Sequence, residues 1–375
     1  MKIGFDAKRI VQNFTGLGNY GRYVIEILSR FCPDDQYLLF APKQKKNERL
    51  KLLQTQKNVS FFFPSGIDRY IPAVWRSMGI RKDLRNNEIN IYHGLSNELP
   101  FGIEYTNIKS VVTIHDLIFL RYPEFYKPID RLIYRLKFRH ACMIADKVIA
   151  ISECTKHDII SYFSIPEEKI AVVYQGCHQQ FRQLVSEAKK REIREKYGLP
   201  AQFLLSVGSI ESRKNLLLAV KALKHLPEDI HLVAIGKATP YQTEIEAFAL
   251  QSGLKSRLHI RNNLAFNDLP AIYQLASVFL YPSFFEGFGI PVIEALSCGV
   301  PVIAATGSCL EEAGGPDSVY VDPNDDQELA ARVLEILSDT SLTNRMIEAG
   351  KAYVKRFDDE RIACELMNIY QSIYS

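Results

Sequence analysis

The stretch from Tyr281 to Thr306, YPSFFEGFGIPVIEALSCGVPVIAAT, limits the folds open to this chain more than any other part of it. The apolar run Val278 to Tyr281 predicts a buried strand, and a glycine-containing loop follows. A helix is expected to begin near Pro291 and to end at Gly299, because proline favours the first turn of a helix and glycine the position just past its end. Val302 to Ala304 predicts the next strand. This strand, loop, helix, strand order is typical of a parallel α/β sheet.

The loop of this unit has the features of an anion-binding site. Backbone amides at the start of a helix lie at the positive end of the helix dipole and bind phosphate. Glu286 lies in the loop and Glu294 in the helix, so two carboxylates can approach one ligand from two sides. Carboxylates accept hydrogen bonds from hydroxyl groups, and a sugar nucleotide carries both hydroxyls and phosphates. The alternative is a capped helix with two solvated glutamates.

The pattern EGFGIPVIE, followed by A-x-x-x-G-x-PV, resembles the C-terminal signature of the retaining glycosyltransferases of family 4, which have the two-domain GT-B fold. The resemblance implies that Glu286 contacts the transferred sugar and that Glu294 holds the ribose hydroxyls. It also implies that the amides of the loop approach the donor phosphates. The loop residues concerned are Gly287, Phe288, Gly289 and Ile290.

Length and composition fit a globular protein of two or three domains, with 375 residues, 47% hydrophobic and 24% charged. Seven cysteines without a C-x-x-C pair favour a reducing compartment and argue against a zinc site. A net charge of +3 gives no indication of nucleic-acid binding. The apolar runs are too short to span a bilayer, and Met1 leads directly into an expected strand, so no signal peptide is expected. These features predict a cytoplasmic protein, with the inner face of the cell membrane as an alternative location.

Residues Gly16 to Gly21 spell G-x-G-x-x-G, with a helix expected from Tyr20 to Arg30. In a dinucleotide-binding fold these glycines follow a strand directly, whereas here a long loop separates them from the strand that ends at Asp6. TGLGNY is instead similar to the T-G-I-G-R-Y loop of the same family, with Asn19 in place of arginine. The resemblance implies that three amides of this loop face the donor diphosphate, those of Gly16, Leu17 and Gly18. An ordinary turn is the alternative.

Predicted strands and helices alternate along both halves of the chain, which indicates an α/β fold with two Rossmann-like, doubly wound parallel sheets. We expect an acceptor-side domain over residues 1–177 and a donor-binding domain over residues 178–359. A final helix, about residues 360–375, is expected to pack back on the first domain. By resemblance, the two domains face a central cleft.

His115 follows a predicted strand at the edge of the sheet where parallel α/β proteins bind ligands. A lone histidine is more often structural than functional. The segment VVTIHDLIFLRYPE, however, is similar to the V-T-I-H-D-L segment of mannosyltransferase-like members of the family, which include O-antigen polysaccharide glycosyltransferases. The resemblance implies a catalytic His115 beside the primary hydroxyl of the donor sugar. His93 ends a shorter strand and is a second candidate, on the acceptor side.

Two cations, Arg213 and Lys214, follow the predicted strand Phe203 to Val207 and are expected to meet the donor diphosphate. The family pattern G-R-x-x-x-x-K implies that Lys214 is the main phosphate cation, and Ser209 stands at its arginine position. Arg213 is either a helper cation or a structural surface residue. Arg261 stands where backbone groups of relatives contact the nucleotide base.

The segment from Ile129 to Ala145 is amphipathic at helical spacing. The ordinary interpretation is a helix with its apolar side on the core and its basic side in water. The alternative is contact with anionic lipid headgroups or a lipid-diphosphate acceptor, together with the basic stretch Arg69 to Lys82. The basic side chains of the helix are Arg131, Arg135, Lys137 and Arg139.

The resemblance implies a retaining glycosyltransferase that moves a hexose, with mannose favoured, from GDP-mannose or a UDP-sugar, and we expect it to be metal-independent. The acceptor is expected to be a saccharide or lipid-linked saccharide in surface polysaccharide synthesis. No Asp-x-Asp pair occurs, so Lys214, Arg213 and loop amides are expected to stabilise the leaving nucleotide without a metal or cofactor. By resemblance, attack occurs on the same face of the sugar and without a covalent Glu286 intermediate. The alternatives are a GT-B sugar-nucleotide epimerase or phosphorylase, or an inactive sugar-nucleotide-binding protein.

Overall fold

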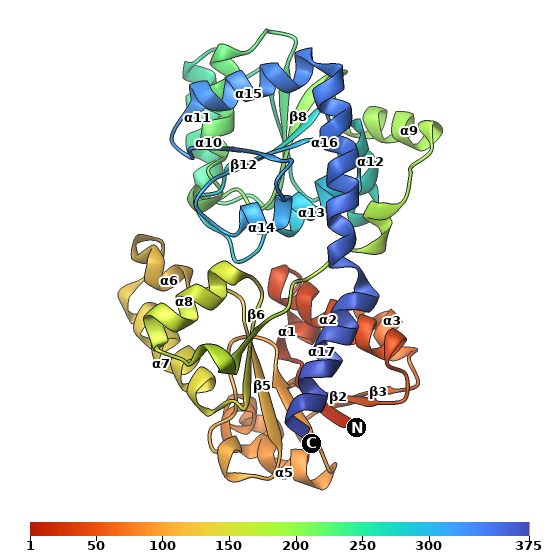
Figure 1. Cartoon of the computed structure of the whole chain (residues 1–375), viewed down its shortest axis with the longest axis vertical. Coiled ribbons are helices and arrows are strands. Elements are labelled where there is room, and N and C mark those ends of the chain that lie inside the picture. Colours follow the sequence, from red (N-terminus) through yellow and green to blue (C-terminus); the bar gives the residue numbers. More distant parts are fainter. Residues whose placement is uncertain (375) are drawn as a thin grey trace. The chain divides into compact units, whose positions relative to one another are not determined.

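The computed structural model describes residues 1–374, which form two compact units (Figure 1). The first unit comprises Met1–Gln175 and the chain from Phe357 onward, and the second comprises Gly176–Arg356. Each is built on one parallel sheet, which confirms the prediction of two doubly wound α/β domains. No helix among the described residues is long and apolar enough to cross a bilayer.

The sheet of the first unit has the order β3-β2-β1-β4-β5-β6-β7, and all of its pairings are parallel. Its strands are β1 (Lys2–Asp6), β2 (Gln36–Phe40), β3 (Val59–Phe62), β4 (Ile91–Gly94), β5 (Lys109–Ile114), β6 (Lys147–Ala150) and β7 (Ile170–Val172). Its α-helices are α1 (Lys8–Gln12), α2 (Gly16–Phe31), α3 (Lys51–Gln54), α4 (Pro72–Val74), α5 (Ile80–Asn86), α6 (Ile118–Arg121), α7 (Pro128–Ile144), α8 (Glu153–Phe163) and α17 (Asp359–Tyr374).

The sheet of the second unit has the order β10-β9-β8-β11-β12-β13 and is also parallel. Its strands are β8 (Phe203–Val207), β9 (His231–Ile235), β10 (Leu258–Arg261), β11 (Val278–Tyr281), β12 (Val302–Ala305) and β13 (Val319–Val321). Its α-helices are α9 (Glu187–Tyr197), α10 (Leu216–Ala222), α11 (Tyr241–Gln251), α12 (Leu269–Leu275), α13 (Ile290–Ser297), α14 (Leu310–Gly314), α15 (Asp326–Ser338) and α16 (Thr340–Tyr353). The central strands are short apolar runs buried along their whole length, as expected where helices cover both faces of a sheet.

The C-terminal helix α17 packs against α2 within the first unit, as Figure 1 shows. Tyr23 on α2 donates a hydrogen bond to Asp359 at the start of α17, with a distance of 3.1 Å. Near the other end, the Tyr370 hydroxyl lies 2.7 Å from Nδ1 of His93, and Nε2 of the same ring lies 2.8 Å from the Thr113 hydroxyl. A buried polar chain therefore ties α17 to β4 and β5.

Helix α2 begins at Gly16, four residues before the expected start at Tyr20. Its first turn lies so close to the end of α1 that only glycine fits at position 18. A Cβ added there would lie 2.1 Å from the carbonyl oxygen of Asn13, whereas a Cβ added at Gly16 would meet nothing within 4 Å. Close packing rather than local turn chemistry therefore explains this glycine.

Replacing Gly18 by alanine is expected to destabilise the first unit by about 1–3 kcal/mol, because the added methyl group overlaps backbone that cannot move easily. Gly16→Ala is the matched control, since it adds the same atom to the same turn in open space. The midpoint of urea unfolding should fall for Gly18→Ala alone. Equal midpoints for the two variants would contradict this packing argument.

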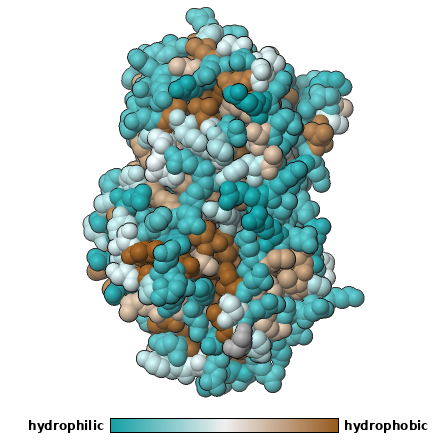
Figure 2. All heavy atoms as spheres, viewed as in Figure 1, coloured by the Kyte–Doolittle hydropathy of each residue, from teal (hydrophilic) through white to brown (hydrophobic). Residues whose placement is uncertain are grey.

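Helix α7 corrects the interpretation that its apolar side faces the core. The core side is formed by Ala141 and Cys142, with Phe138 packed beside them. Four large apolar residues at helical spacing are instead 43–65% exposed, and Figure 2 shows hydrophobic side chains at the surface of this unit. The four residues are Ile129, Leu132, Ile133 and Leu136. The predicted helix is confirmed, but the apolar stripe formed by these four residues faces solvent and not the core.

Candidate active site

Glu286 lies at the centre of a charged cluster in the second unit. Its carboxylate forms ion pairs with Lys214 at 2.7 Å and with Arg213 at 3.0 Å. The Lys214 ammonium also donates to the Tyr281 hydroxyl, at 2.6 Å. The two cationic side chains are 16% exposed and the Glu286 side chain 11% exposed, so water screens these pairs only weakly. The structure thus brings together three residues that the sequence analysis assigned to the donor site.

The cluster is held in place by the turn that follows β8. Asn215 has the left-handed backbone conformation at the end of this turn, with φ of 55°. Its side-chain amide donates to the carbonyls of Pro282, at 3.1 Å, and Pro323, at 2.7 Å. The backbone amide of Phe284 donates to the carbonyl of Arg213, at 3.0 Å. The turn that carries the cations is therefore fastened to the loop that carries Glu286.

The electrostatics of the cluster keep all three groups charged. Burial disfavours the ionised form of Glu286, but the adjacent Lys214 and Arg213 outweigh it and lower its pKa to about 2. Burial likewise opposes the charge on Lys214 and Arg213, and the Glu286 carboxylate more than compensates, so the pKa of each is raised. Glu286 is therefore ionised near neutral pH. It can accept hydrogen bonds, and the two cations can stabilise an anion.

Ser209 and Glu211 lie beside these cations. The Ser209 hydroxyl donates to the Glu211 carboxylate, which also lies 3.6 Å from Arg213. Glu211, which accepts this hydrogen bond and lies beside Arg213, belongs to no motif that the sequence revealed. Lys214 and Ser209 line an open pocket of about 280 Å³ at the carboxyl ends of β8 and β9, a usual place for a ligand.

The loop from Gly287 to Ile290 leads into α13, which begins at Ile290, one residue before the predicted start. Gly289 caps the helix with φ of 117°, a conformation that favours glycine, and a Cβ there would lie 2.9 Å from the Leu310 side chain. The buried thiol of Cys309 donates to the carbonyls of Glu286 and Phe288, at 3.0 and 3.1 Å. Cys309, which no sequence motif marked, therefore helps to hold the loop that is predicted to bind phosphate.

Glu294 lies on α13, and its carboxylate accepts a hydrogen bond of 2.9 Å from the buried Tyr273 hydroxyl. Burial is the main influence on this group and raises its pKa to about 7, although the bond from Tyr273 acts in the opposite direction. Glu294 is therefore poised to ionise near neutral pH. Glu294 thus accepts a hydrogen bond from a neutral tyrosine, whereas Glu286 is paired with two cations.

Arg261 is at the end of β10, and its guanidinium is engaged by backbone. It donates to the carbonyl of Tyr197, at 3.0 Å, and to that of Ile260, at 3.2 Å. Its backbone carbonyl accepts a hydrogen bond from Gly236, at the end of β9. These contacts hold the edge of the sheet, and none of them joins Arg261 to the Glu286 cluster.

His115 follows β5 in the first unit and is 7% exposed. Its Nε2 lies 2.9 Å from the carbonyl oxygen of Leu95, and because a carbonyl can only accept, Nε2 carries the proton. Nδ1 is then the acceptor in the neutral ring. Burial lowers the pKa of His115 to about 4, although the bond to Leu95 opposes this shift. A neutral imidazole can accept a hydrogen bond from a hydroxyl group at neutral pH.

Tyr20 connects His115 with the predicted glycine loop. Its ring meets the imidazole edge-on, with centroids 4.6 Å apart. Tyr20 belongs to α2, whose first turn contains Gly16, Leu17 and Gly18. The structure thus places the start of α2 and His115 on neighbouring elements of the same unit.

His93 does not match its predicted role on the acceptor side. The side chain is fully buried, and both ring nitrogens are hydrogen-bonded, to Tyr370 and Thr113. Burial and the neighbouring His115 lower its pKa to about 3. His93 is a core residue, because α17 covers the end of its strand.

Comparisons with known proteins agree with this geometry. The family model "Glycosyltransferase Family 4" matches residues 21–180, and "Glycosyl transferases group 1" matches residues 189–353. O-antigen chain mannosyltransferase B of Escherichia coli is 28% identical across 99% of this chain and the whole of that protein. Serotype-specific mannosyltransferase WbdA of Escherichia coli is 30% identical across 72% of this chain and 34% of that longer protein.

Among solved structures, HepE of Anabaena in complex with UDP and glucose superposes with a TM-score of 0.77. The match covers 99% of this chain and all of that one, at 20% identity, and so concerns the fold alone. Such neighbours confirm the GT-B class of the two parallel-sheet domains. The two family models match consecutive parts of the chain that correspond to its two units. The chain belongs to the glycosyltransferases of group 1 and family 4.

Proposed function

We propose that this glycosyltransferase is a metal-independent retaining enzyme that moves a hexose from a nucleotide diphosphate sugar to a saccharide or lipid-linked saccharide. The observation that carries the proposal is the ionised Glu286 held between Lys214 and Arg213 beside an open pocket. The mannosyltransferase names of the relatives favour mannose, and with it GDP-mannose. The structural neighbour with bound UDP and glucose keeps a UDP-sugar as the second candidate donor.

In the proposed reaction, the bond between the anomeric carbon and the phosphate oxygen breaks, and the nucleotide diphosphate leaves with the electron pair. The acceptor hydroxyl forms the new bond on the same face of the sugar and passes its proton to the departing phosphate oxygen. Lys214 and Arg213 stabilise the charge that develops on this leaving group. Glu286 accepts hydrogen bonds from the sugar, and neutral His115 accepts one through Nδ1.

The amides at Gly287 to Ile290 and at the start of α2 are proposed to bind the diphosphate, as expected of helix N-termini. No cofactor is assigned to this reaction. The proposed location is the cytoplasm, in a pathway of surface polysaccharide synthesis, with peripheral contact at the inner face of the cell membrane. The names of the relatives and the seven cysteines without a C-x-x-C pair support this placement.

Thermal unfolding in a panel of GDP, UDP, ADP, their sugar conjugates and NAD tests the proposal, because a ligand that binds only the folded state raises the midpoint. One nucleotide and its sugar conjugate should raise the midpoint equally with and without EDTA. Chromatography of the products should show sugar transfer to an acceptor. Conversion of the nucleotide sugar without an acceptor would indicate an epimerase. The proposed function would be contradicted if NAD alone shifted the midpoint, or if no ligand of the panel shifted it.

The raised pKa of Glu294 predicts a pH-dependent affinity for the donor. The ionised carboxylate accepts hydrogen bonds from the ribose hydroxyls more strongly than the neutral acid does, and ionisation occurs near pH 7. Affinity for a nucleotide sugar should therefore rise by about tenfold between about pH 6 and about pH 8. Calorimetric titrations at several pH values measure this change. In Glu294→Gln the rise should disappear, and a rise that persists would assign it to another group.

The exposed apolar stripe of α7 supports the proposed membrane contact. Leu132 and Leu136 lie on this stripe, and Arg135 and Arg139 are exposed on the same helix. Apolar side chains flanked by basic ones suit insertion among anionic headgroups.

Replacing Leu132 and Leu136 together by serine is expected to abolish sedimentation with phosphatidylglycerol vesicles, because the variant buries less apolar surface in the bilayer. Leu184→Ser is the matched control, since Leu184 is also exposed but lies in the second unit. The control should sediment like the original protein. If the original protein, the double variant and the control sedimented equally, and to the same extent with anionic and neutral vesicles, the proposed contact through α7 would be contradicted.

A further inference from the structure

A chain of buried side chains connects the C-terminal helix α17 with His115. It begins at Tyr370 of α17, whose hydroxyl lies 2.7 Å from Nδ1 of His93. Nε2 of His93 lies 2.8 Å from the Thr113 hydroxyl, which in turn lies 3.2 Å from the hydroxyl of Tyr20 on α2. The Tyr20 ring then meets the His115 imidazole edge-on. All five residues are at most 7% exposed, so water does not replace any of these contacts.

His93 is the central member of this chain, and the proposed reaction does not use it. Burial and the neighbouring His115 lower its pKa to about 3, so the ring is neutral. In a neutral imidazole one nitrogen donates and the other accepts, so the ring joins two hydroxyl groups that play opposite roles towards it. Removal of either hydroxyl would leave a buried nitrogen without its partner, which costs more than the hydrogen bond contributes.

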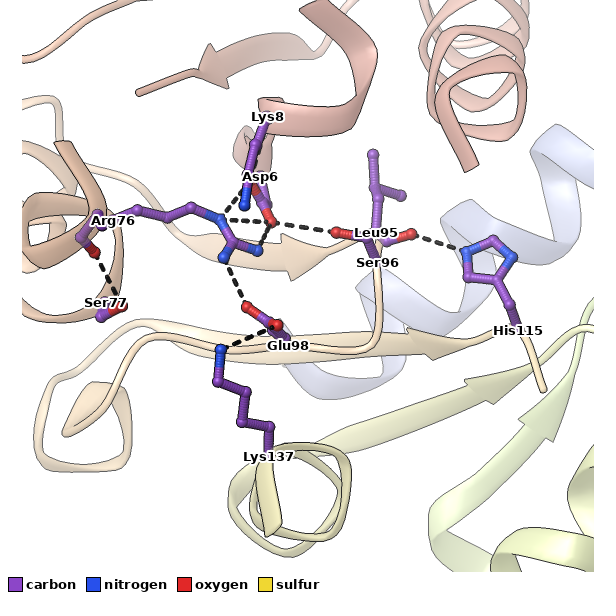
Figure 3. A network of polar contacts seen from close by, with 10 residues as sticks. Asp6, Lys8, Arg76, Ser77, Leu95, Ser96, Glu98, His115 and Lys137 are labelled. Atoms are coloured by element: carbon purple, nitrogen blue, oxygen red, sulfur yellow. Dashed lines mark hydrogen bonds and ion pairs between the residues drawn. The ribbon is translucent and has the colours of Figure 1, made fainter. Parts of the chain in front are cut away.

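The chain runs beside the hydrogen bond that holds His115. Nε2 of His115 donates to the carbonyl of Leu95 at 2.9 Å, and Figure 3 shows these two residues facing each other. His93 lies two positions before Leu95, and Thr113 lies two positions before His115. The contact between His93 and Thr113 therefore helps to set the distance at which Leu95 meets His115.

Tyr20 limits the part of the His115 geometry that this hydrogen bond leaves open. The Leu95 carbonyl is itself restrained, because the next residue, Ser96, donates to the buried Asp6 carboxylate at 3.3 Å (Figure 3). One hydrogen bond fixes Nε2 of the imidazole but leaves the ring free to tilt about that atom. The Tyr20 ring, with its centroid 4.6 Å from that of the imidazole, restricts this tilt. The tilt thus depends on how firmly the hydroxyl end of Tyr20 is held.

We infer that Tyr370 of α17 positions the His115 imidazole through this chain. The inference rests on the proposed function, in which the neutral imidazole accepts a hydrogen bond from the sugar. Tyr370, His93 and Tyr20 are positioning residues, since none of them is proposed to touch a substrate. Without the Tyr370 hydroxyl, His93 and the groups bonded to it are held less firmly, and the imidazole spends less time in the orientation that the sugar requires. The C-terminal helix therefore contributes to turnover as well as to the stability of the first unit.

Steady-state kinetics of Tyr370→Phe in the full chain tests this inference, because phenylalanine fills the same space and removes only the hydroxyl. The kcat is expected to fall by about fivefold. KM for the nucleotide sugar should stay unchanged, since the cations proposed to bind the diphosphate, Lys214 and Arg213, lie in the second unit. Tyr20→Phe should act in the same direction. The double variant should lose less than the product of the two single losses, because both substitutions interrupt one chain.

NMR of the full chain with 15N-labelled histidine follows His115 itself. The spectrum of His115→Gln assigns its signal among the eight histidines. In the original protein the two ring nitrogens should show the shifts of the single tautomer with the proton on Nε2, which the bond to Leu95 selects. In Tyr370→Phe both shifts should move toward the average of the two tautomers, because the ring is held less firmly on this carbonyl.

Two matched controls make the same substitution near the chain but outside it. Tyr23→Phe removes a different hydrogen bond between α2 and α17, the one that Tyr23 donates to Asp359. Tyr374→Phe changes a tyrosine one turn further along α17 that is 50% exposed. Neither control should alter kcat or the His115 signals.

The inference would be overturned if Tyr370→Phe left both kcat and the His115 signals as in the original protein. It would also be overturned if kcat fell without any change in these signals, or if Tyr23→Phe lowered kcat to the same extent. The proposed function is tested separately by sugar transfer in the original protein. If the original protein transfers no sugar while Tyr370→Phe still moves the His115 signals, the proposed function fails and the positioning of His115 by Tyr370 stands.

Discussion

Replacing Glu286 by glutamine is expected to lower kcat by about a hundredfold or more while leaving nucleotide binding intact or tighter. The carboxylate is ionised, with a pKa of about 2, and is proposed to contact the reacting sugar, so its loss removes stabilisation on the order of 3 kcal/mol from the transition state. Glutamine keeps the size of the side chain. Lys214 and Arg213 then lack their anionic partner, and a bound diphosphate can replace it.

Steady-state kinetics with donor and acceptor, together with thermal shifts by nucleotide, measure both parts of this prediction. The shift caused by the nucleotide should be larger in Glu286→Gln than in the original protein. Glu335→Gln makes the same change in an exposed ion pair with Arg332 and should alter neither quantity. An unchanged kcat in Glu286→Gln would show that the active site has been assigned to the wrong residue.

Replacing Lys214 by methionine is expected to reduce both nucleotide affinity and kcat/KM, the latter by about a hundredfold. Lys214 is the cation paired most closely with Glu286, and methionine retains much of its length without the charge. The buried Glu286 carboxylate would also lose an ion-pair partner and the Tyr281 hydroxyl a hydrogen-bond donor, so a lower melting temperature is expected as well. This pattern differs from that of Glu286→Gln, in which nucleotide binding survives.

Calorimetric titration with the nucleotide and initial-rate kinetics test this second prediction, with the exposed Lys255→Met as the control. The double variant of Glu286 and Lys214 completes a mutant cycle, and its effects should be less than additive because the two side chains act as one pair. Additive losses would indicate that the two residues act independently. Full nucleotide affinity in Lys214→Met would remove Lys214 from the diphosphate site.

The segment around Glu286 was the most predictable part of the molecule, because its signals are local. Strand β11 has the predicted bounds Val278–Tyr281, and α13 begins within one residue of the predicted Pro291. Gly299 follows this helix with φ of 74°, the conformation expected of a glycine just past a helix end. An apolar run, a proline and a glycine fix these bounds without any distant contact.

Other features depend on contacts between residues far apart in the chain. Amphipathic spacing predicted helix α7. It could not show that the apolar stripe of this helix is left exposed, because that depends on the other elements of the fold. His93 and His115 both stand at the end of a predicted strand, and only the packing of α17 shows that His93 is a core residue. The early start of α2 likewise follows from its close approach to Asn13.

Periodicity, turn residues and motifs act over short stretches of chain, so they predicted the alternating strands and helices, the parallel sheets and the residue types assigned to the proposed donor site. The protonation states and partners of these residues depend on the folded chain. Glu286 is ionised because the fold brings Lys214, from a distant turn, next to its carboxylate. Glu294 has a raised pKa because the fold buries it beside Tyr273. Burial and charge pairing depend on distances that no local pattern records, so both had to come from the folded chain.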